Sequence, residues 1–138
     1  ESCFPELKPS LEGGPHDRRI ALQTLSKIAP VKEECMMYLT EALKDPDEDI
    51  RRYGAEGLGK LGESAISHLN ALLPLLRDPS MGARGAAATA MGDMGPNAEA
   101  ALPFLHDAMN NDFSGVGQEC RMAIEKIDPT QIGQIIVR

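Results

Sequence analysis

The side chains of this chain that could do chemistry are three histidines and three cysteines, and their spacing predicts no reactive site. They are His16, His68, His106, Cys3, Cys35 and Cys120. None of the histidines stands in an HxxxH or HExxH pattern, and no two cysteines form a CxxC pair, so the spacings typical of metal ligands are absent from the sequence. A catalytic Ser/His/Asp arrangement and a glycine-rich phosphate loop cannot be recognised either. We therefore predict that the chain is not an enzyme, and that it has no catalytic, metal-binding or cofactor-binding residues.

The same residues have a simpler structural interpretation. His106 falls in register with Leu73 and Thr40, at the edge of a predicted hydrophobic face, so we expect it at the margin of the core. The cysteines are odd in number and far apart, which gives no disulfide framework and favours a reducing compartment. This pattern predicts a cytoplasmic location, with the cysteines acting as small hydrophobic residues.

Composition limits the partners of the chain. Its 138 residues carry 21 acidic and 14 basic side chains, for a formal net charge of −7. Nucleic-acid affinity comes from Lys and Arg that neutralise phosphates, so this balance argues against a nucleic acid and against an anionic membrane surface. No apolar run approaches the roughly 20 residues that a membrane span requires. Because the chain begins with Glu1 rather than Met, we expect it to be a piece of a longer protein or, less favoured, a processed product.

A repeat with a period of about 33 residues, within the range typical of helical repeat proteins, runs along most of the chain. Asp45-Pro46 recurs as Asp78-Pro79, and Leu61-Gly62 recurs as Met94-Gly95. Hydrophobic positions share the period, as in the register Leu39, Leu72 and Leu105 and the register Met36, Leu69 and Leu102. A fixed period of this length is typical of stacked copies of one supersecondary unit.

Hydrophobic spacing predicts two helices in each copy. In the second copy, residues 31–44 and 47–61 place apolar residues three and four apart, and Asp45-Pro46 separates the two segments. Gly62 is expected to end the second of these helices. The corresponding predicted pairs are 4–12 with 16–29, 64–77 with 80–94, and 97–110 with 114–127. We divide the single domain 1–138 into repeats at 4–30, 31–63, 64–96 and 97–129, followed by a tail at 130–138 that caps the last repeat or is truncated.

The inward positions of the second helices alternate between small and large residues. One predicted inward column is Ala21, Gly54, Ala87 and Cys120, the next is Thr24, Gly57, Ala90 and Ala123, and the third is Leu25, Leu58, Met91 and Ile124. Glycine inside a helix costs roughly 1 kcal/mol relative to alanine. We expect close packing to offset part of that cost at the interior glycines, which are Gly54, Gly57, Gly59, Gly85 and Gly92.

Residues 43–62 (LKDPDEDIRRYGAEGLGKLG) and 76–95 (LRDPSMGARGAAATAMGDMG) resemble HEAT repeats, and most closely the short subclass first noted in phycobilin lyases, the PBS-lyase-like repeats. The resemblance covers about 16–128. It implies an all-α fold, a right-handed α-solenoid of about four two-helix repeats. It says little about function, because such repeats serve many unrelated proteins. The repeat architecture, the missing catalytic constellation and the acidic balance together predict a non-enzymatic protein–protein interaction or scaffold module.

The HEAT pattern includes an Asp near the turn and an Arg six residues later. The matching residues here are Glu12 with Arg18, Asp45 with Arg51, and Asp78 with Arg84, whereas Asn111 and Gly117 replace the pair in the fourth repeat. The arginines could bind a partner, or they could form a ladder of charge-assisted hydrogen bonds between successive turns. We favour the structural ladder.

The resemblance also implies that the second helices line the concave face. Their outward positions in the first two repeats are predicted to bind a partner, and they are Arg19, Gln23, Lys27, Arg52, Glu56 and Lys60. These residues make that half of the groove basic and polar, which predicts a partner protein with an acidic or mixed-charge surface. The alternative is a solvated helix face without a ligand.

Three other functions stay open at this point. The resemblance to lyases suggests a chromophore-handling domain for bilins, although the chain has no Trp and only 4% aromatic residues. A structural spacer within a larger protein is a second alternative. A nucleic-acid repair domain of the HEAT-like glycosylase type is a third, and the net charge of −7 argues against it.

Overall fold

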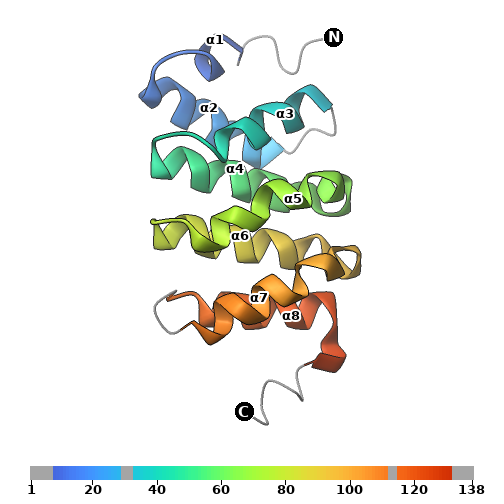
Figure 1. Ribbon diagram of the computed structural model, residues 1–138. Helices are drawn as coiled ribbons and strands as arrows, with labels where there is room; N and C mark the ends of the chain where they lie inside the picture. The colour runs from blue at the N-terminus through green and yellow to red at the C-terminus, as the bar shows by residue number, and fades with distance from the viewer. Residues whose placement is uncertain (1–7, 29–32, 112–114, 132–138) are drawn as a thin grey trace.

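The computed structural model describes residues 8–28, 33–111 and 115–131, and within them every regular element is helical. Two layers of helices stack in chain order, with α1 and α2 at one end and α7 and α8 at the other (Figure 1). One layer holds α2 (Pro15–Ile28), α4 (Glu48–Leu61), α6 (Met81–Asp93) and α8 (Gly117–Ile127). The other layer holds α1 (Lys8–Leu11), α3 (Glu33–Ala42), α5 (Leu69–Leu72) and α7 (Leu102–Asn110). It also contains three 3₁₀ segments, which are η1 (Gly62–His68), η2 (Leu73–Arg77) and η3 (Gly95–Ala101). A further 3₁₀ segment, η5 (Pro129–Gln131), follows α8. The predicted α-solenoid is confirmed.

The helices α2, α4 and α6 begin and end within one residue of the predicted bounds, whereas α8 begins at Gly117, three residues after the predicted start. Asp47 caps α4, because its side chain accepts a hydrogen bond from the backbone N–H of Asp49 at 2.8 Å. Ser80 caps α6 in the same way, through the N–H of Ala83. Gly62 ends α4 with a φ of 57°, a left-handed conformation that favours glycine. In α4 the cap and the glycine together fix the length of the helix, and so which of its residues face outward.

The first helices of the third and fourth repeats differ from the prediction. Residues 64–77 do not form one α-helix but a 3₁₀ segment, a single α-helical turn and a second 3₁₀ segment. Pro74 lies in the first turn of η2, and it has no N–H with which to continue an α-helical ladder. Likewise, residues 97–110 begin as η3 and become α-helical only at Leu102, with Pro103 in the first turn of α7. The prolines therefore divide helices that apolar spacing alone predicts as continuous.

The two ends of the chain show less of the predicted structure. In the first repeat the described part of the first helix is α1, a single turn, and residues 4–7 lie outside the described residues. Thr24, predicted to be inward, is exposed, and its hydroxyl donates to the carbonyl of Ile20 at 2.9 Å. Within the described residues, α1 is too short to cover this part of α2. Of the predicted tail at 130–138, residues 130–131 belong to η5, and residues 132–138 lie outside the described residues.

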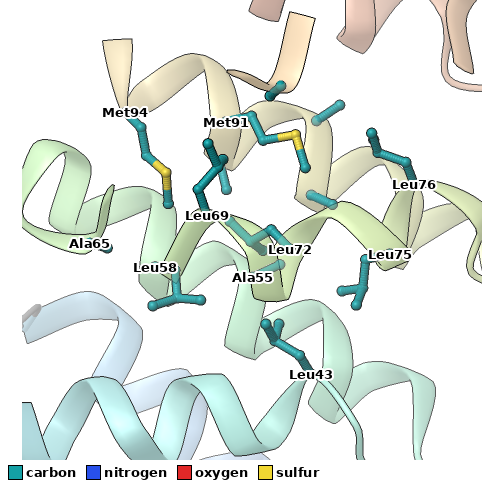
Figure 2. Close-up of a cluster of buried hydrophobic side chains, with 14 of the residues drawn as sticks. Leu43, Ala55, Leu58, Ala65, Leu69, Leu72, Leu75, Leu76, Met91 and Met94 are labelled. Atoms are coloured by element: carbon teal, nitrogen blue, oxygen red, sulfur yellow. The ribbon is translucent and has the colours of Figure 1, made fainter. Parts of the chain in front are cut away.

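An aliphatic core fills the space between the two layers. Figure 2 shows Leu58 of α4 and Met91 of α6 facing Leu69 and Leu72 from the first helix of the third repeat. All four side chains are buried. The predicted column Leu25, Leu58, Met91 and Ile124 is fully buried along the whole stack. Successive repeats thus share one continuous core, as expected for a solenoid.

Two glycines allow each pair of second helices to touch. A Cβ atom on Gly59 of α4 would lie 2.9 Å from the Cα of Ala90 on α6. One repeat later, a Cβ on Gly92 of α6 would lie 2.8 Å from the Cα of Ala123 on α8. Real Cβ atoms do not approach a backbone atom so closely, so these positions require glycine if the helices keep their separation.

The other interior glycines fall into two kinds. A Cβ on Gly54 would lie 2.7 Å from the backbone carbonyl oxygen of Leu39, so glycine is required there for α4 to meet α3. A Cβ on Gly57 would lie 2.5 Å from Cδ2 of the same leucine, so the Leu39 side chain packs directly against this glycine and would have to move. Gly85 of α6 is different, because its nearest neighbours would be side-chain atoms of Val116 and Glu119 at 3.7 and 3.9 Å. Close packing therefore explains four of the five interior glycines but not Gly85.

Candidate functional site

Arg51 binds two successive turns. Arg51 donates from Nη1 to the carbonyl oxygens of Asp45 and Pro46, at 2.8 and 3.1 Å, within its own repeat. Its Nε and Nη2 donate to the two carboxylate oxygens of Asp78 in the next repeat, at 2.8 and 3.0 Å. This two-point geometry is the strongest form of an Arg–carboxylate contact. Arg51 therefore joins the second repeat to the third.

The other arginines of this series make related contacts. Arg18 donates to the carbonyl of Gly13 at 3.0 Å and forms an ion pair with Asp45 at 2.9 Å. Arg84 donates to the carbonyl oxygens of Asp78 and Pro79 at 2.6 and 3.2 Å.

Glu12 does not act as the partner of Arg18 among the described residues. It instead accepts a hydrogen bond from the hydroxyl of Tyr38 at 3.3 Å. The contacts of Arg18 and Arg51 run between neighbouring turns, and those of Arg84 hold its own turn, which supports a structural role for the three arginines rather than a binding one.

A hollow of about 680 Å³ lies on the face formed by the second helices. We call it the α6 groove, because α6 forms its floor with Gly82, Gly85, Ala86 and Thr89. One wall comes from α4, and the opposite wall comes from the start of α8. The α4 wall contains Arg52, Tyr53, Glu56 and Lys60, and the α8 wall contains Val116 and Glu119. Met81, the first residue of α6, also lines the groove. The groove exists because the floor residues are too small to fill it.

The structure brings four of the six predicted binding residues to this groove. Gln23, Arg52, Glu56 and Lys60 line it. Arg19 does not line it, and its guanidinium instead pairs with Asp47 at 2.8 Å. The side chain of Lys27 lies outside the described part of the chain. The predicted face is therefore hollow, but its centre lies over the third repeat rather than the first two.

The basic character predicted for this face is largely neutralised by neighbouring acids. Arg52 lies 3.5 Å from carboxylate oxygens of both Asp49 and Glu56, and its guanidinium stacks 4.6 Å from the ring centre of Tyr53. Burial alone would lower the pKa of Arg52, but the charge of Glu56, together with Tyr53 and Asp49, outweighs burial and raises it. Hydrogen bonding to Arg19 likewise lowers the pKa of Asp47. Arg19 and Arg52 therefore already have carboxylate partners in the same chain.

Sequence reasoning missed the apolar part of the groove. Tyr53 forms part of the α4 wall, and Met81 stands at the rim with 58% of its surface exposed. The period contained a signal for this surface, because Ile20, Tyr53 and Ala86 occupy the same position in successive repeats. Ile20 is also half-exposed. This column lies directly beside the polar columns that the sequence singled out.

His68, His106 and Cys120 have neighbours that are typical of structural residues. His68 lies 3.4 Å from the hydroxyl of Thr40, and His106 lies 2.7 Å from the side-chain oxygen of Gln131. No group of three or more potential metal ligands occurs in the described ranges. Burial raises the pKa of the Cys120 thiol to about 11, which keeps it protonated and unreactive at neutral pH. No described helix is long and apolar enough to span a bilayer.

Two stacked helical layers with a groove on one of them define an α-solenoid repeat protein. Residues 36–125 match the HEAT repeats, a match that covers well over half of the chain. The chain therefore belongs to the HEAT repeat family. No curated protein matches its sequence at a significant level.

The fold is also similar to that of a solved structure. An engineered protein, determined by crystallography in a structural genomics consortium, superimposes with a TM-score of 0.71 at 20% sequence identity. The match covers 89% of this chain and 61% of that one, so the chain spans less than two thirds of the length of the engineered protein. At this identity the likeness supports the fold alone.

Proposed function

We propose that this chain is a non-enzymatic protein–protein interaction module that binds a segment of a partner protein in the α6 groove. The observation that carries the proposal is an aromatic and an arginine side chain, Tyr53 and Arg52, standing over a floor of Gly82, Gly85 and Ala86. Tyr and Arg are enriched among the residues that dominate binding energy at protein interfaces. A floor with such small residues leaves room for an anchor from the partner.

Family membership and charge support the same proposal. HEAT repeats are scaffolds that generally mediate protein interactions, and the second helices, which line this groove, form the concave face that we propose as the binding surface. The net charge of −7 disfavours a nucleic acid as the partner. We place the module in a reducing compartment, the cytoplasm, because its three cysteines form no recognisable disulfide framework.

The alternatives make different demands on the groove. A bilin-handling domain needs a pocket for a planar chromophore, and Tyr53 is the aromatic residue among the lining residues of this groove. A structural spacer needs no ligand, so filling the groove would have no effect on its interactions. The experiment below separates the spacer from the interaction module.

Filling the groove is expected to abolish partner binding while the fold is retained. Gly85→Gln places a polar side chain on the groove floor, where the nearest atoms to a Cβ are 3.7 and 3.9 Å away. We expect the partner, isolated from native lysate by pull-down, identified by mass spectrometry and then purified, to bind this variant at least about tenfold more weakly in calorimetric titration.

Gly85→Ala is the matched control, since it adds a single carbon at the same position and leaves most of the groove open. It should bind like the wild type. A partner that binds wild type and Gly85→Gln equally would show that the groove is not the binding surface. If neither protein captures a specific partner, the spacer interpretation is favoured.

A further inference from the structure

Among the described residues, one acidic side chain at the wall of the groove has no ion-pair partner. Glu119 lies in the first turn of α8 and is half-buried, and its Cγ lies 3.9 Å from the position of a Cβ on Gly85. Across the described ranges, no ion pair or side-chain hydrogen bond involves Glu119. A carboxylate at an apolar surface interacts more strongly with an incoming cation than one surrounded by water.

Three of the other four charged residues that line the groove have an ion-pair partner in the described structure. Arg52 pairs with Asp49 and Glu56 at 3.5 Å. Asp93 pairs with Lys126 at 3.0 Å. Lys60 is exposed in the last turn of α4, where the helix dipole and water stabilise its charge. Glu119 is therefore the half-buried groove charge with most to gain from a partner.

The segment that supplies the groove floor and the α8 wall has an excess of acidic residues. From Asp78 to Cys120 the sequence contains six acidic residues and a single basic residue, Arg84. Two of these acids, Asp93 and Glu119, line the groove, and Asp93 pairs with Lys126 at 3.0 Å. Glu119 is therefore the acid of this segment that favours a cationic ligand in the groove.

The apolar floor lies next to this carboxylate. Gly85 is adjacent to Glu119 across the groove, and Tyr53 and Met81 stand on either side of the floor. A ligand that fits both features carries an apolar side chain and a positive charge close together. The ion pairs of Arg19 and Arg52 weigh against the acidic partner that the sequence alone suggests.

We propose that the partner segment in the α6 groove is basic: it places an apolar side chain over Gly85 and pairs a neighbouring Lys or Arg with Glu119. This inference rests on the proposed function, because it names the chemistry of the ligand of the same groove. The apolar anchor supplies contact area, and the ion pair fixes the register of the segment.

A phage-displayed library of randomised peptides, selected on the full chain, tests the inference. We expect peptides that bind wild type but not Gly85→Gln to be enriched in a Lys or Arg next to Leu, Ile, Met or Phe. A synthetic peptide of that sequence should bind Glu119→Gln about tenfold more weakly than wild type. Replacing its Lys or Arg with Glu should restore binding to Glu119→Lys, because the charges of the pair are then exchanged.

Glu125→Gln is the matched control, since Glu125 is an exposed glutamate of the same helix that does not line the groove. It should leave peptide affinity unchanged. Groove-dependent peptides that lack a basic residue, or that bind Glu119→Gln as tightly as wild type, would overturn the inference but leave the proposed function standing. A selection that yields no peptide sensitive to Gly85→Gln would overturn both.

Discussion

Asp78→Asn is expected to lower the free energy of unfolding by about 2–3 kcal/mol, since it leaves a largely buried guanidinium without its countercharge. Asp78 is 9% exposed and accepts two hydrogen bonds from Arg51 and a third from the backbone N–H of Ser80. The variant keeps the shape of the side chain but removes its charge, and Arg51 is then held by neutral acceptors alone. Urea unfolding followed by circular dichroism measures the loss.

Asp107→Asn is the control for this prediction. Asp107 also pairs with an arginine of the preceding repeat, Arg77, at 3.0 Å, but both side chains are mostly exposed, at 68% and 84%. Exposed pairs contribute less than about 1 kcal/mol, so this variant should be close to wild type. Equal effects of Asp78→Asn and Asp107→Asn would contradict the assignment of Asp78 and Arg51 as a coupling between repeats.

The same contact predicts how stability depends on pH. Burial tends to raise the pKa of Asp78, but the hydrogen bonds from Arg51 and Ser80 and the charges of Arg51 and Arg84 outweigh burial, and the net pKa is lowered. Its contribution is therefore fully present above the unfolded-state pKa of about 3.9 and is lost as pH falls through the folded-state value. Unfolding measured from pH 7 downward should show a shallower acid limb in Asp78→Asn than in wild type.

Gly92→Ala is expected to destabilise the protein by about 1–3 kcal/mol, even though alanine is the better helix former by about 1 kcal/mol. The added Cβ would meet the Cα of Ala123 at 2.8 Å, and a backbone atom cannot rotate away as a side chain can. α6 and α8 must separate, and the contacts along their length weaken. Gly59→Ala should behave in the same way, because its Cβ would meet the Cα of Ala90 at 2.9 Å.

Gly85→Ala, on the same helix as Gly92, is expected to stabilise the protein rather than destabilise it. Its Cβ has ordinary van der Waals neighbours at 3.7 and 3.9 Å, so the gain in helix propensity is not offset by a clash. We expect it to stabilise the protein by up to about 1 kcal/mol. Thermal unfolding of both variants should therefore shift in opposite directions. A rise in the melting temperature of Gly92→Ala would show that the second helices separate without cost.

The sequence predicts the fold well because the repeat carries its information several times. The Asp-Pro turn at Asp45-Pro46, the glycine at Gly62 and the hydrophobic columns recur in successive repeats, so helix boundaries in the second layer could be placed from the period. The first layer was harder to predict. Apolar spacing there is regular, but Pro74 and Pro103 shift the backbone hydrogen bonding to 3₁₀ segments, and periodicity does not register a missing N–H donor.

The repeat period predicts which residues share the groove face, but it does not predict the ion pairs or the hollow on that face. The period groups Arg52, Glu56 and Lys60 on one face, and all three line the groove. The period does not show that acids of the same helix, Asp49 and Glu56, pair with Arg52. Asp49 lies three residues before Arg52 and Glu56 four after it, both on the same side of α4. A hollow forms where side chains are small or missing. From the sequence alone, a glycine that lines a hollow, such as Gly85, cannot be told from a glycine that close packing requires. The distances around each glycine make that distinction.

The glycines of α4 and α6 have a consequence for folding cooperativity. α4 contains Gly54, Gly57 and Gly59, and α6 contains Gly82, Gly85 and Gly92, so each helix has low intrinsic helicity. In a linear array, stability divides between each unit and its interfaces with its nearest neighbours. Here the close approaches at Gly59 and Gly92 place most of that stability in the interfaces. The array should then unfold in a single concerted transition, and deletion of one repeat would melt the repeat beside it.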